Sequence, residues 1–301
     1  MCRSPPVPCY PLSICDQFMT KESSPLPLVS IGLPVFNGEQ FLEQAIASIL
    51  DQSYSNLELL ISDNCSTDRT ERIATDAAGR DSRIRYHRSD VNLGAAPNFN
   101  RLVELASGSY FKWAAHDDLL HPQYLETCVK ALESDPSLVW AHTRAQNIDD
   151  AGDLGELRHW NVDFHSWYPY RRFGDAILVN HECLNVFGVI RTELLRKTGL
   201  IGSYIASDRV LLAQLSLMGR YCEVPIVGFF HREHTQRSTL AHKSMRERLT
   251  WFNPRAGYTP PNLRLGMEYA RSIRQSNIRR KYKAYCYLAL ARWCLRGGQR
   301  F

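Results

Sequence analysis

Residues 57–64 read Leu-Glu-Leu-Leu-Ile-Ser-Asp-Asn, an apolar run of β-strand composition that closes on two polar side chains. A second β-like run, residues 110–115, is followed directly by His116, Asp117 and Asp118. Both runs place carboxylates at the end of a strand, and that edge is where open α/β sheets bind ligands. Carboxylates at such an edge can hold a base, a divalent metal ion or a reacting hydroxyl group.

Strands and helices alternate on either side of these two runs. Residues 28–33 predict a buried strand that Pro34 ends, and residues 83–87 predict another strand. Between the first two strands, apolar residues recur at helical spacing, namely at Phe41, Ala45 and Ile49. Strands that alternate with helices predict an α/β fold with a doubly wound, mainly parallel sheet. After about residue 135 the loops lengthen and gain aromatic residues, which indicates a second half that lines a cleft.

The composition is that of a globular protein, with 301 residues of which 44% are hydrophobic and 22% are charged. This length suffices for one large α/β unit with an ample core. The nine cysteines are scattered and form no Cys-x-x-Cys pair, which predicts a reduced, cytoplasmic chain rather than a disulfide framework. No run approaches the roughly 20 apolar residues that a membrane-spanning helix needs.

The N-terminal residues differ from the rest in composition. Residues 1–27 carry six prolines and show no hydrophobic periodicity. They also lack the apolar core of a secretory signal, so we expect a disordered leader. Met19 is an alternative start that would leave the predicted fold intact.

The C-terminal residues are strongly basic. Residues 271–301 contain nine bases and no acid, a charge of +9 against +5 for the whole chain. They belong to a predicted basic, helical extension over residues 241–301. Such a helix can lie on an anionic membrane surface, as a peripheral contact, or pack as a solvated helix on the rest of the protein. Nucleic acid is a poorer explanation because no recognised binding motif accompanies the bases.

Four segments in order resemble the motifs of family 2 glycosyltransferases. Residues 28–39 look like the family's opening strand and loop, whose proline, aromatic-Asn pair and glutamate are matched here. The other three segments are residues 62–68, similar to the family's Asp-Asp/Asn-x-Ser-Thr-Asp, residues 92–94 with Asn100, similar to its Asn-x-Gly…Asn loop, and residues 115–118, which stand where it has Asp-x-Asp-Asp. The resemblance covers residues 28–240.

The resemblance implies a fold of the nucleotide-diphospho-sugar transferase type with a C-terminal helical extension. Residues 28–130 would form the half that binds the nucleotide sugar, and residues 131–240 the half that binds the acceptor. The implied activity is inverting transfer of a sugar from a nucleoside-diphosphate sugar, with a UDP-sugar favoured, to a hydroxyl-bearing glycan or lipid-linked acceptor. Synthesis of polysaccharides, lipid-linked glycans or cell-envelope glycans would use such a step.

The resemblance also assigns residues to the nucleotide. Asp63 would accept a hydrogen bond from the base, and its alternative role is that of a cap or turn residue. Gly94 would let its loop lie close to the base, or it is simply a turn glycine. The residues implied to contact the nucleotide are Pro34, Phe36, Asn37, Glu39, Asp63, Asn64, Gly94, Asn100 and Asp117.

A divalent metal ion, Mg²⁺ or Mn²⁺, is implied by the leaving diphosphate. Asp117 and His234 are the candidate ligands, and Ala115 replaces the first acidic residue of the family motif. Sites of this kind use one or two carboxylates together with the phosphates. Residues 231–238 resemble the family's Tyr-Arg-x-His-x-x-Ser segment, in which Arg232 and Arg237 could bind phosphate oxygens or form exposed salt bridges.

Asp208 is the candidate catalytic base. In the family an acidic pair opens a helix that faces the acceptor, and here Ser207-Asp208 precedes the apolar residues 210–218. A carboxylate at a helix N-terminus that takes the proton of the acceptor hydroxyl gives direct displacement and inversion. The alternative is that Ser207 or Asp208 is only the N-cap. Aromatic residues between the halves could form an acceptor wall or could pack the loop: Trp160, Phe164, Trp167, Tyr168, Tyr170 and Phe173.

Two other functions fit parts of the sequence. A catalytically silent binding or scaffold module would explain why Ala115 and Ser207 stand in place of acidic family residues. A nucleotidyltransferase would use the same strand-end carboxylates, but it should carry a glycine- and lysine-rich triphosphate loop near the first strand. Residues 34–38, Pro-Val-Phe-Asn-Gly, are not such a loop.

Overall fold

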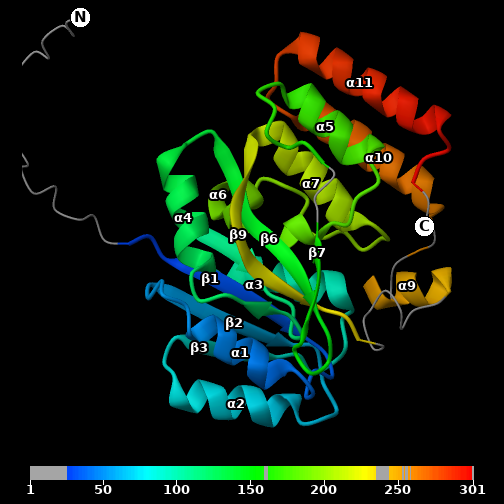
Figure 1. Cartoon of the computed structure of the whole chain (residues 1–301). Coiled ribbons are helices and arrows are strands. Elements are labelled where there is room, and N and C mark those ends of the chain that lie inside the picture. Colours follow the sequence, from blue (N-terminus) through cyan, green and yellow to red (C-terminus); the bar gives the residue numbers. More distant parts are fainter. Residues whose placement is uncertain are drawn as a thin grey trace, which may run out of the picture.

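The computed structural model describes residues 26–158, 162–234, 244–252, 254, 257 and 259–299. The described strands form a nine-stranded sheet in the order β3-β2-β1-β4-β8-β6-β9-β5, and β7 pairs with β6 beside this path. Helices surround the sheet (Figure 1). Most of the predicted leader, residues 1–25, lies outside the described residues.

The N-terminal half of the sheet is parallel, as the alternation of strands and helices predicts. The four parallel strands are β1 (Val29–Val35), β2 (Leu57–Asp63), β3 (Ile84–Arg88) and β4 (Tyr110–Trp113). The helices between them are α1 (Leu42–Leu50), α2 (Thr70–Arg80) and α3 (Ala95–Leu105). In the register of these strands Val35 lies opposite Asp63, and Asp63 lies opposite Arg88. The loops that carry the predicted motifs therefore leave the sheet at one edge.

The sequence predicts that Pro34 ends the first strand. In the structure β1 continues to Val35. The carbonyl of Val35 accepts a hydrogen bond from the backbone of Asn64, so alternate residues of β1 face β2. Pro34 faces the opposite side, where the pairing of β1 with β4 already ends at Gly32. Since no neighbouring strand needs the missing N–H group there, proline fits inside this strand.

The second half of the sheet is mixed. Its elements are β5 (Leu119–Leu120), α4 (Tyr124–Ser134), β6 (Leu138–Ile148), β7 (Leu154–Arg158), α5 (Pro169–Leu178), a 3-10 turn η1 (Leu184–Phe187), β8 (Val189–Arg191), α6 (Thr192–Leu195), α7 (Ser207–Met218) and β9 (Arg220–Arg232). The short strand β8 runs antiparallel to both β4 and β6, whereas β6 and β9 are parallel. The α/β class is confirmed, and parallel pairing occurs both among strands β1 to β4 and between β6 and β9.

Two hydrophobic clusters lie on opposite faces of the sheet. Neighbouring residues of β2 alternate between them, with Leu60 in one cluster and Leu59 and Ile61 in the other. Helices α1 and α4 contribute to the cluster of Leu59, and helices α3, α5 and α7 contribute to the cluster of Leu60. The period of two along a strand that is buried on both sides explains its continuous apolar run.

The C-terminal helices α9 (Met245–Phe252), α10 (Pro261–Gln275) and α11 (Arg280–Leu295) follow the mixed half. Helices α10 and α11 pack with α5 and α7 in one stack of helices beside the sheet (Figure 1). Tyr269, Ile273 and Trp293 are buried in the same cluster as residues of α5 and α7. These two helices are therefore part of the domain core.

The aromatic residues between the halves divide into two groups. Phe164 and Phe173 are fully buried core residues, so they do not form an acceptor wall. Trp167 and Tyr168 are exposed, and Tyr170 is partly buried with its ring 4.8 Å from that of Tyr285. Trp160 lies outside the described residues.

The cysteines of the described residues are free thiols: Cys65, Cys128, Cys183, Cys222, Cys286 and Cys294. Within the same residues, no helix has both the length and the apolar content that crossing a membrane requires.

Candidate active site

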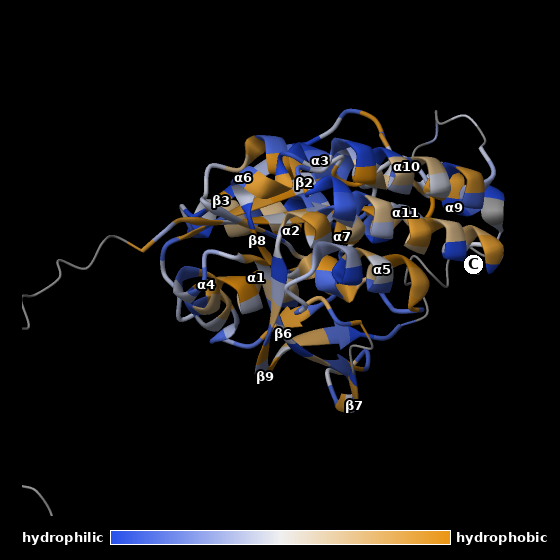
Figure 2. Ribbon diagram, turned by 90° about the horizontal axis from the view of Figure 1, so that it is seen from above, coloured by the Kyte–Doolittle hydropathy of each residue, from blue (hydrophilic) through white to orange (hydrophobic). Residues whose placement is uncertain are grey.

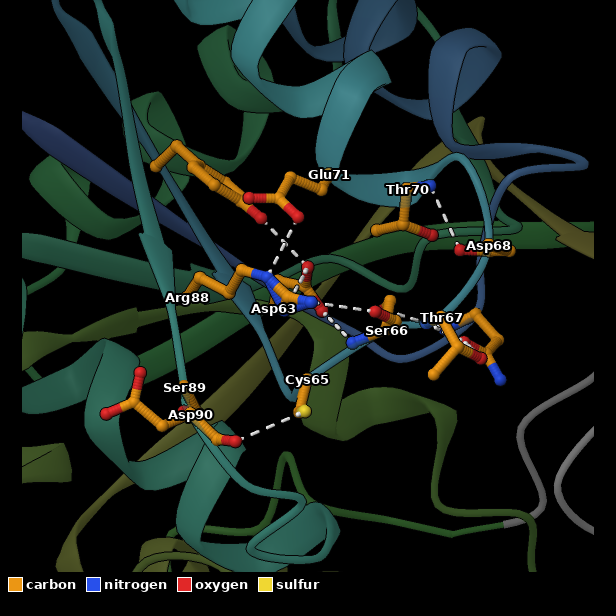
Figure 3. A network of polar contacts seen from close by, with 12 residues as sticks. Asp63, Cys65, Ser66, Thr67, Asp68, Thr70, Glu71, Arg88, Ser89 and Asp90 are labelled. Carbon is orange, nitrogen blue, oxygen red and sulfur yellow. Dashed lines mark hydrogen bonds and ion pairs between the residues drawn. The ribbon is translucent and has the colours of Figure 1, made fainter.

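Asp63 is the last residue of β2 and is fully buried beneath the loops at the carboxyl edge. Its Oδ1 accepts a hydrogen bond from the Ser66 amide at 2.8 Å, and its Oδ2 accepts one from the Tyr86 hydroxyl at 2.8 Å. The Arg88 guanidinium is 4.0 Å from the same Oδ2 (Figure 3). Each carboxylate oxygen retains a second lone pair, although the side chain has no exposed surface in this structure.

The loop after β1 and the loop after β2 are joined by hydrogen bonds. The Asn37 amide donates to Ser66 Oγ at 2.9 Å, and Asn37 Oδ1 accepts from the Thr67 amide at 2.9 Å. Glu39 Oε2 accepts from the amide and the side chain of Arg69, and these bonds hold the pKa of Glu39 below its usual range. Asn37 and Glu39 are therefore occupied in holding the loops, whereas Phe36 beside them is 44% exposed.

Asn64 fixes the loop that ends at α3. Its Nδ2 donates to Asn92 Oδ1 at 2.9 Å and to the Gly94 carbonyl at 3.2 Å, and its Oδ1 accepts from the Leu93 amide. Gly94 has φ +86°, a left-handed conformation that favours glycine. The structure thus brings the predicted Asp63, Asn64 and Gly94 together.

The side chain of Asn100 contacts the backbone of Ile201 rather than these loops. Its Nδ2 donates to the carbonyl of Ile201 at 2.9 Å, and its Oδ1 accepts from the amide of Ile201 at 3.0 Å. These two bonds connect α3 to the loop that leads into α7. The side chain of Asn100 is committed to this backbone contact, which the sequence does not reveal because Ile201 lies 101 positions away.

Asp117 and His234 meet although they are 117 residues apart. His234 Nε2 lies 2.8 Å from Asp117 Oδ2, and the His234 ring packs against Phe41 at 5.1 Å. Burial alone would raise the pKa of Asp117, but the hydrogen bond to His234 and the charge of His116 outweigh it and hold the pKa at about 2. Asp117 is therefore a carboxylate throughout the physiological pH range.

Arg232 corrects an expectation about the same segment. It is fully buried, so it is neither an exposed salt-bridge partner nor a group that reaches phosphate. Its guanidinium donates to the backbone carbonyls of Asp117, Asp149 and Asp150 and to Gln44 Oε1. Arg232 therefore braces the loop that carries Asp117. Arg237 lies outside the described residues.

Asp118 is not available as a further metal ligand of the same kind. Its Oδ1 lies 3.0 Å from His231 Nδ1 and accepts from the Arg232 amide at 2.9 Å. Within the described residues, no group of three or more His, Cys, Asp and Glu side chains could hold a metal ion. Asp117 and His234 are a pair, so a cation bound there would draw its other ligands from the diphosphate and water.

The pair nevertheless fits an octahedral cation. Adjacent ligands of an ion with bonds of about 2.1 Å lie about 3 Å apart, and the two candidate atoms are 2.8 Å apart. The other ring nitrogen of His234 is buried without a hydrogen-bond partner in the described structure. Mg²⁺ prefers oxygen ligands, so the imidazole of His234 favours Mn²⁺ over Mg²⁺.

Asp208 lies in the first turn of α7 but does not cap the helix. The N-cap is Ala206, which makes no side-chain cap hydrogen bond, and Asp208 Oδ1 accepts from the amide of Arg209 at 2.8 Å. The interpretation of Ser207 or Asp208 as the N-cap is therefore wrong. Burial raises the pKa of Asp208, although the amide and the charge of Arg209 and the Cys183 thiol oppose the rise.

Arg209 anchors the start of α7. It is buried, and its guanidinium donates to the carbonyls of Ala176, Val179 and His181 at the end of α5. A cation at the C-terminus of a helix is stabilised by the helix dipole. The backbone that carries Asp208 is thereby tied to α5.

Left-handed backbone conformations of residues other than glycine occur only in these loops of the described structure, at Asn37, Cys65, Leu200 and Ala206. Such conformations cost free energy, and they cluster at functional sites. Asn37 and Cys65 follow β1 and β2, and Leu200 and Ala206 precede Asp208. Strain therefore marks both parts of the candidate site, the part around Asp63 and the part around Asp208.

Comparison with known sequences supports this geometry. The sequence model of glycosyl transferase family 2 matches residues 30–198, more than half of the chain. The chain belongs to glycosyl transferase family 2. This glycosyltransferase is 35% identical to chondroitin synthase from Escherichia coli over 157 residues, which are 52% of this chain and 22% of that protein. It is 24% identical over 245 residues to an uncharacterized glycosyltransferase from Haemophilus influenzae, covering 77% of this chain and 76% of that protein.

Solved structures share the fold of this family 2 glycosyltransferase. TarS of S. aureus, residues 1–349 in complex with UDP-GlcNAc, matches with a TM-score of 0.63 at 15% identity and covers 88% of this chain and 72% of that one. The mannosyltransferase PcManGT from Pyrobaculum calidifontis, in complex with GDP-Man and Mn²⁺, matches with a TM-score of 0.53 at 18% identity, over 89% and 87% of the two chains. The predicted fold of the nucleotide-diphospho-sugar transferase type is confirmed.

Proposed function

We propose that this glycosyltransferase moves a sugar from a UDP-sugar to a hydroxyl group of a glycan or lipid-linked acceptor, with inversion. The observation that carries the proposal is the pairing of Asp117 with His234 beside the nucleotide loops. Gly38 packs so closely on His116 that a Cβ atom there would lie 2.7 Å from the histidine ring. The loop of Phe36 and Asn37 thus lies against the loop of Asp117.

The described residues fit distinct roles in such a transfer. Asp63 accepts a hydrogen bond from the base, and the exposed ring of Phe36 stacks beside it. Asp117 and His234 would hold a divalent ion, which neutralises charge on the departing diphosphate. Asp208 accepts the proton of the acceptor hydroxyl, and its raised pKa brings a carboxylate nearer to the pH at which a general base works best.

The relatives suggest the class of product. Chondroitin synthase from Escherichia coli and hyaluronan synthase from Pasteurella multocida are both among the matched proteins. The chain spans 22% and 13% of their lengths, so it corresponds to one part of each. We therefore infer a role in the synthesis of polysaccharide, lipid-linked glycan or cell-envelope glycan. Free thiols at the described cysteines support a cytoplasmic location.

The metal assignment is tested by Asp117→Asn, which keeps the size of the side chain and removes its charge. We expect release of UDP from a panel of UDP-sugars with Mn²⁺ to fall more than about tenfold, a loss above roughly 1.4 kcal/mol in transition-state stabilisation. Asp90→Asn is the matched control because Asp90 is exposed in a neighbouring loop. A variant at position 117 that retains more than about a tenth of the wild-type rate would show that the metal assignment is wrong.

The nucleotide base is tested by a thermal-shift screen. A ligand that binds only the native state raises the melting temperature by mass action. We expect UDP with Mn²⁺ to raise the melting temperature more than GDP, ADP or CDP with the same ion. A larger shift with another nucleotide would assign a different donor to the same site.

A further inference from the structure

One face of helix α11 carries a stripe of apolar and basic side chains. Lys281, Tyr285, Leu288, Arg292 and Leu295 follow one another at spacings of four and three residues, so they share that face. Leu288 and Leu295 are 57% and 88% exposed, and Tyr285 is 50% exposed. These five residues are called the α11 stripe below.

The stripe is held outward by the packing of the opposite face. Cys286, Ala289 and Trp293 are buried in the hydrophobic cluster that α11 shares with α5 and α10. Helix α11 is the outermost helix of this stack (Figure 1). Coloured by hydropathy, it shows apolar and polar residues interleaved along its length (Figure 2). Leu288 and Leu295 on this face are largely exposed.

Charge distinguishes this surface from an ordinary exposed helix. Residues 271–299 contain eight bases and no acid: Arg271, Arg274, Arg279, Arg280, Lys281, Lys283, Arg292 and Arg296. Within the described residues, the bases of α11 itself form no ion pair, since the one acid that meets this group, Glu268, contacts Arg271 of α10. The α11 stripe therefore combines apolar and basic side chains on a helix that contains no acid.

We propose that the α11 stripe docks on the surface of an anionic lipid bilayer. Interfacial helices of this kind bury leucine and aromatic side chains at the acyl boundary while their bases meet anionic headgroups. Nucleic acid explains less of the surface, because phosphate contacts use the bases and leave Leu288 and Leu295 without a partner. A bilayer accounts for the leucines and for the bases together.

Docking of α11 on the bilayer would fix the orientation of the candidate active site relative to the membrane. Helix α11 packs on α5, and α5 packs on α7, whose first turn carries Asp208. An enzyme docked in this way would meet a lipid-linked acceptor at the surface of the bilayer. This consequence rests on the proposed function, whereas the docking surface does not.

The experiment is sedimentation of the full chain with vesicles of phosphatidylcholine and phosphatidylglycerol in equal parts, compared with vesicles of phosphatidylcholine alone. Lys281→Gln with Arg292→Gln should lower partitioning about 25-fold, at about fivefold for each base. Leu288→Ser with Leu295→Ser should lower it at least about tenfold. The wild-type protein should also detach as salt is raised.

Two control pairs make the same chemical changes elsewhere. Leu154→Ser with Leu157→Ser alters exposed leucines of β7, and Arg80→Gln with Lys130→Gln removes two exposed charges. Both pairs should sediment nearly as the wild type does. The sites in all four pairs are exposed, and unchanged melting temperatures would verify that each variant folds.

The outcomes separate the docking surface from the proposed function. Equal pelleting of stripe and control variants, or equal binding to neutral and anionic vesicles, would overturn the docking proposal. Binding of a mixed-sequence RNA that depends on the bases and not on the leucines, without vesicle binding, would overturn it in favour of nucleic acid. Loss of sugar transfer with intact, stripe-dependent vesicle binding would instead contradict the proposed function alone.

Discussion

Burial destabilises the carboxylate form of Asp208 and raises its pKa. The raised pKa suits the residue to accept a proton. Because its pKa is higher in the folded protein than in the unfolded chain, the folded state binds more protons between the two pKa values. The free energy of unfolding therefore falls as the pH rises through that window. Above that window the whole cost of the buried charge is present.

Asp208→Asn should separate the two effects. Asparagine keeps the size of the side chain but carries no charge and accepts no proton at neutral pH. We expect turnover to fall on the order of 10²–10⁴-fold, with the dissociation constant for UDP unchanged, while the melting temperature at pH 7 stays the same or rises. Steady-state kinetics, calorimetry and thermal unfolding measure the three quantities. An active Asp208→Asn enzyme would refute the mechanism and leave the nucleotide site standing.

Asp63→Ala should weaken nucleotide binding. The change removes the acceptor that we assign to the base, so the dissociation constant for UDP should rise, as measured by calorimetry. It also leaves the Ser66 amide and the Tyr86 hydroxyl without their partner, so the melting temperature should fall. Tyr86→Phe is the control that disturbs the network and keeps the carboxylate. An unchanged dissociation constant for UDP would leave Asp63 as a turn residue.

At the level of single residues, the sequence predicts positions better than partners. The location of Asp63 at the end of a strand follows from the apolar run of β2, whereas β4 already ends at Trp113, four residues before Asp117. The family resemblance adds His234. The buried partners of Arg232 do not follow, because an arginine in a polar segment predicts an exposed side chain and its acceptors are backbone carbonyls. The sequence does indicate that the side chains of Tyr86 and Arg88 lie together, since positions two apart on a strand share a face.

Strand β4 contains a fully buried lysine that no motif predicts. Lys112 donates to the carbonyls of Trp113 and Phe187 and lies 4.6 Å from the ring centroid of Tyr124. Burial lowers its pKa from 10.5 to about 7, although Cys128 and Asp118 favour the charged form. The unfolded chain therefore binds more protons than the folded protein between about pH 7 and 10.5.

Titration of Lys112 should consequently contribute a rise in the free energy of unfolding across that window, by at most about 1.4 kcal/mol per pH unit. Lys112→Met removes the titrating group while the Tyr124 hydroxyl still donates to the Phe187 carbonyl. We expect the variant to lose the rise between pH 7 and 10, as measured by urea denaturation at matched ionic strength. The same slope in both proteins would mean that Lys112 is not the titrating group.

Among the secondary-structure elements, the sequence best predicts those of the N-terminal half of the sheet. Strands β1 and β2 are predictable from their apolar runs. The parallel order of β1 to β4 follows from the alternation of strands with helical segments. Strand β8 has three residues, too few for a period to emerge, yet it joins β4 to β6 and makes the sheet mixed. The position of β8 in the sheet depends on contacts with residues that are far away in the sequence.

The whole molecule should not tolerate loss of its C-terminal helices. Removing residues 259–301 would uncover the faces of α5 and α7 against which Tyr269, Ile273 and Trp293 pack. Each buried side chain of this size contributes about 1.5–3 kcal/mol, and a domain has about 5–15 kcal/mol in total. We expect the truncated protein to be insoluble or to lack a cooperative melting transition by circular dichroism. Cooperative melting at the temperature of the full chain would instead show an independent appendage.

The contact between Asn100 and Ile201 bears on how such enzymes diversify. Asn100 lies inside the segment that the family shares, and Ile201 lies just beyond its last matched residue, 198. The side chain of Asn100 recognises only the carbonyl and amide of its neighbour. A contact that uses only the backbone atoms of residue 201 tolerates almost any side chain at that position. Grafting a foreign segment after residue 198 would therefore preserve this contact, so the segment that leads into α7 can vary while residues 30–198 keep their structure.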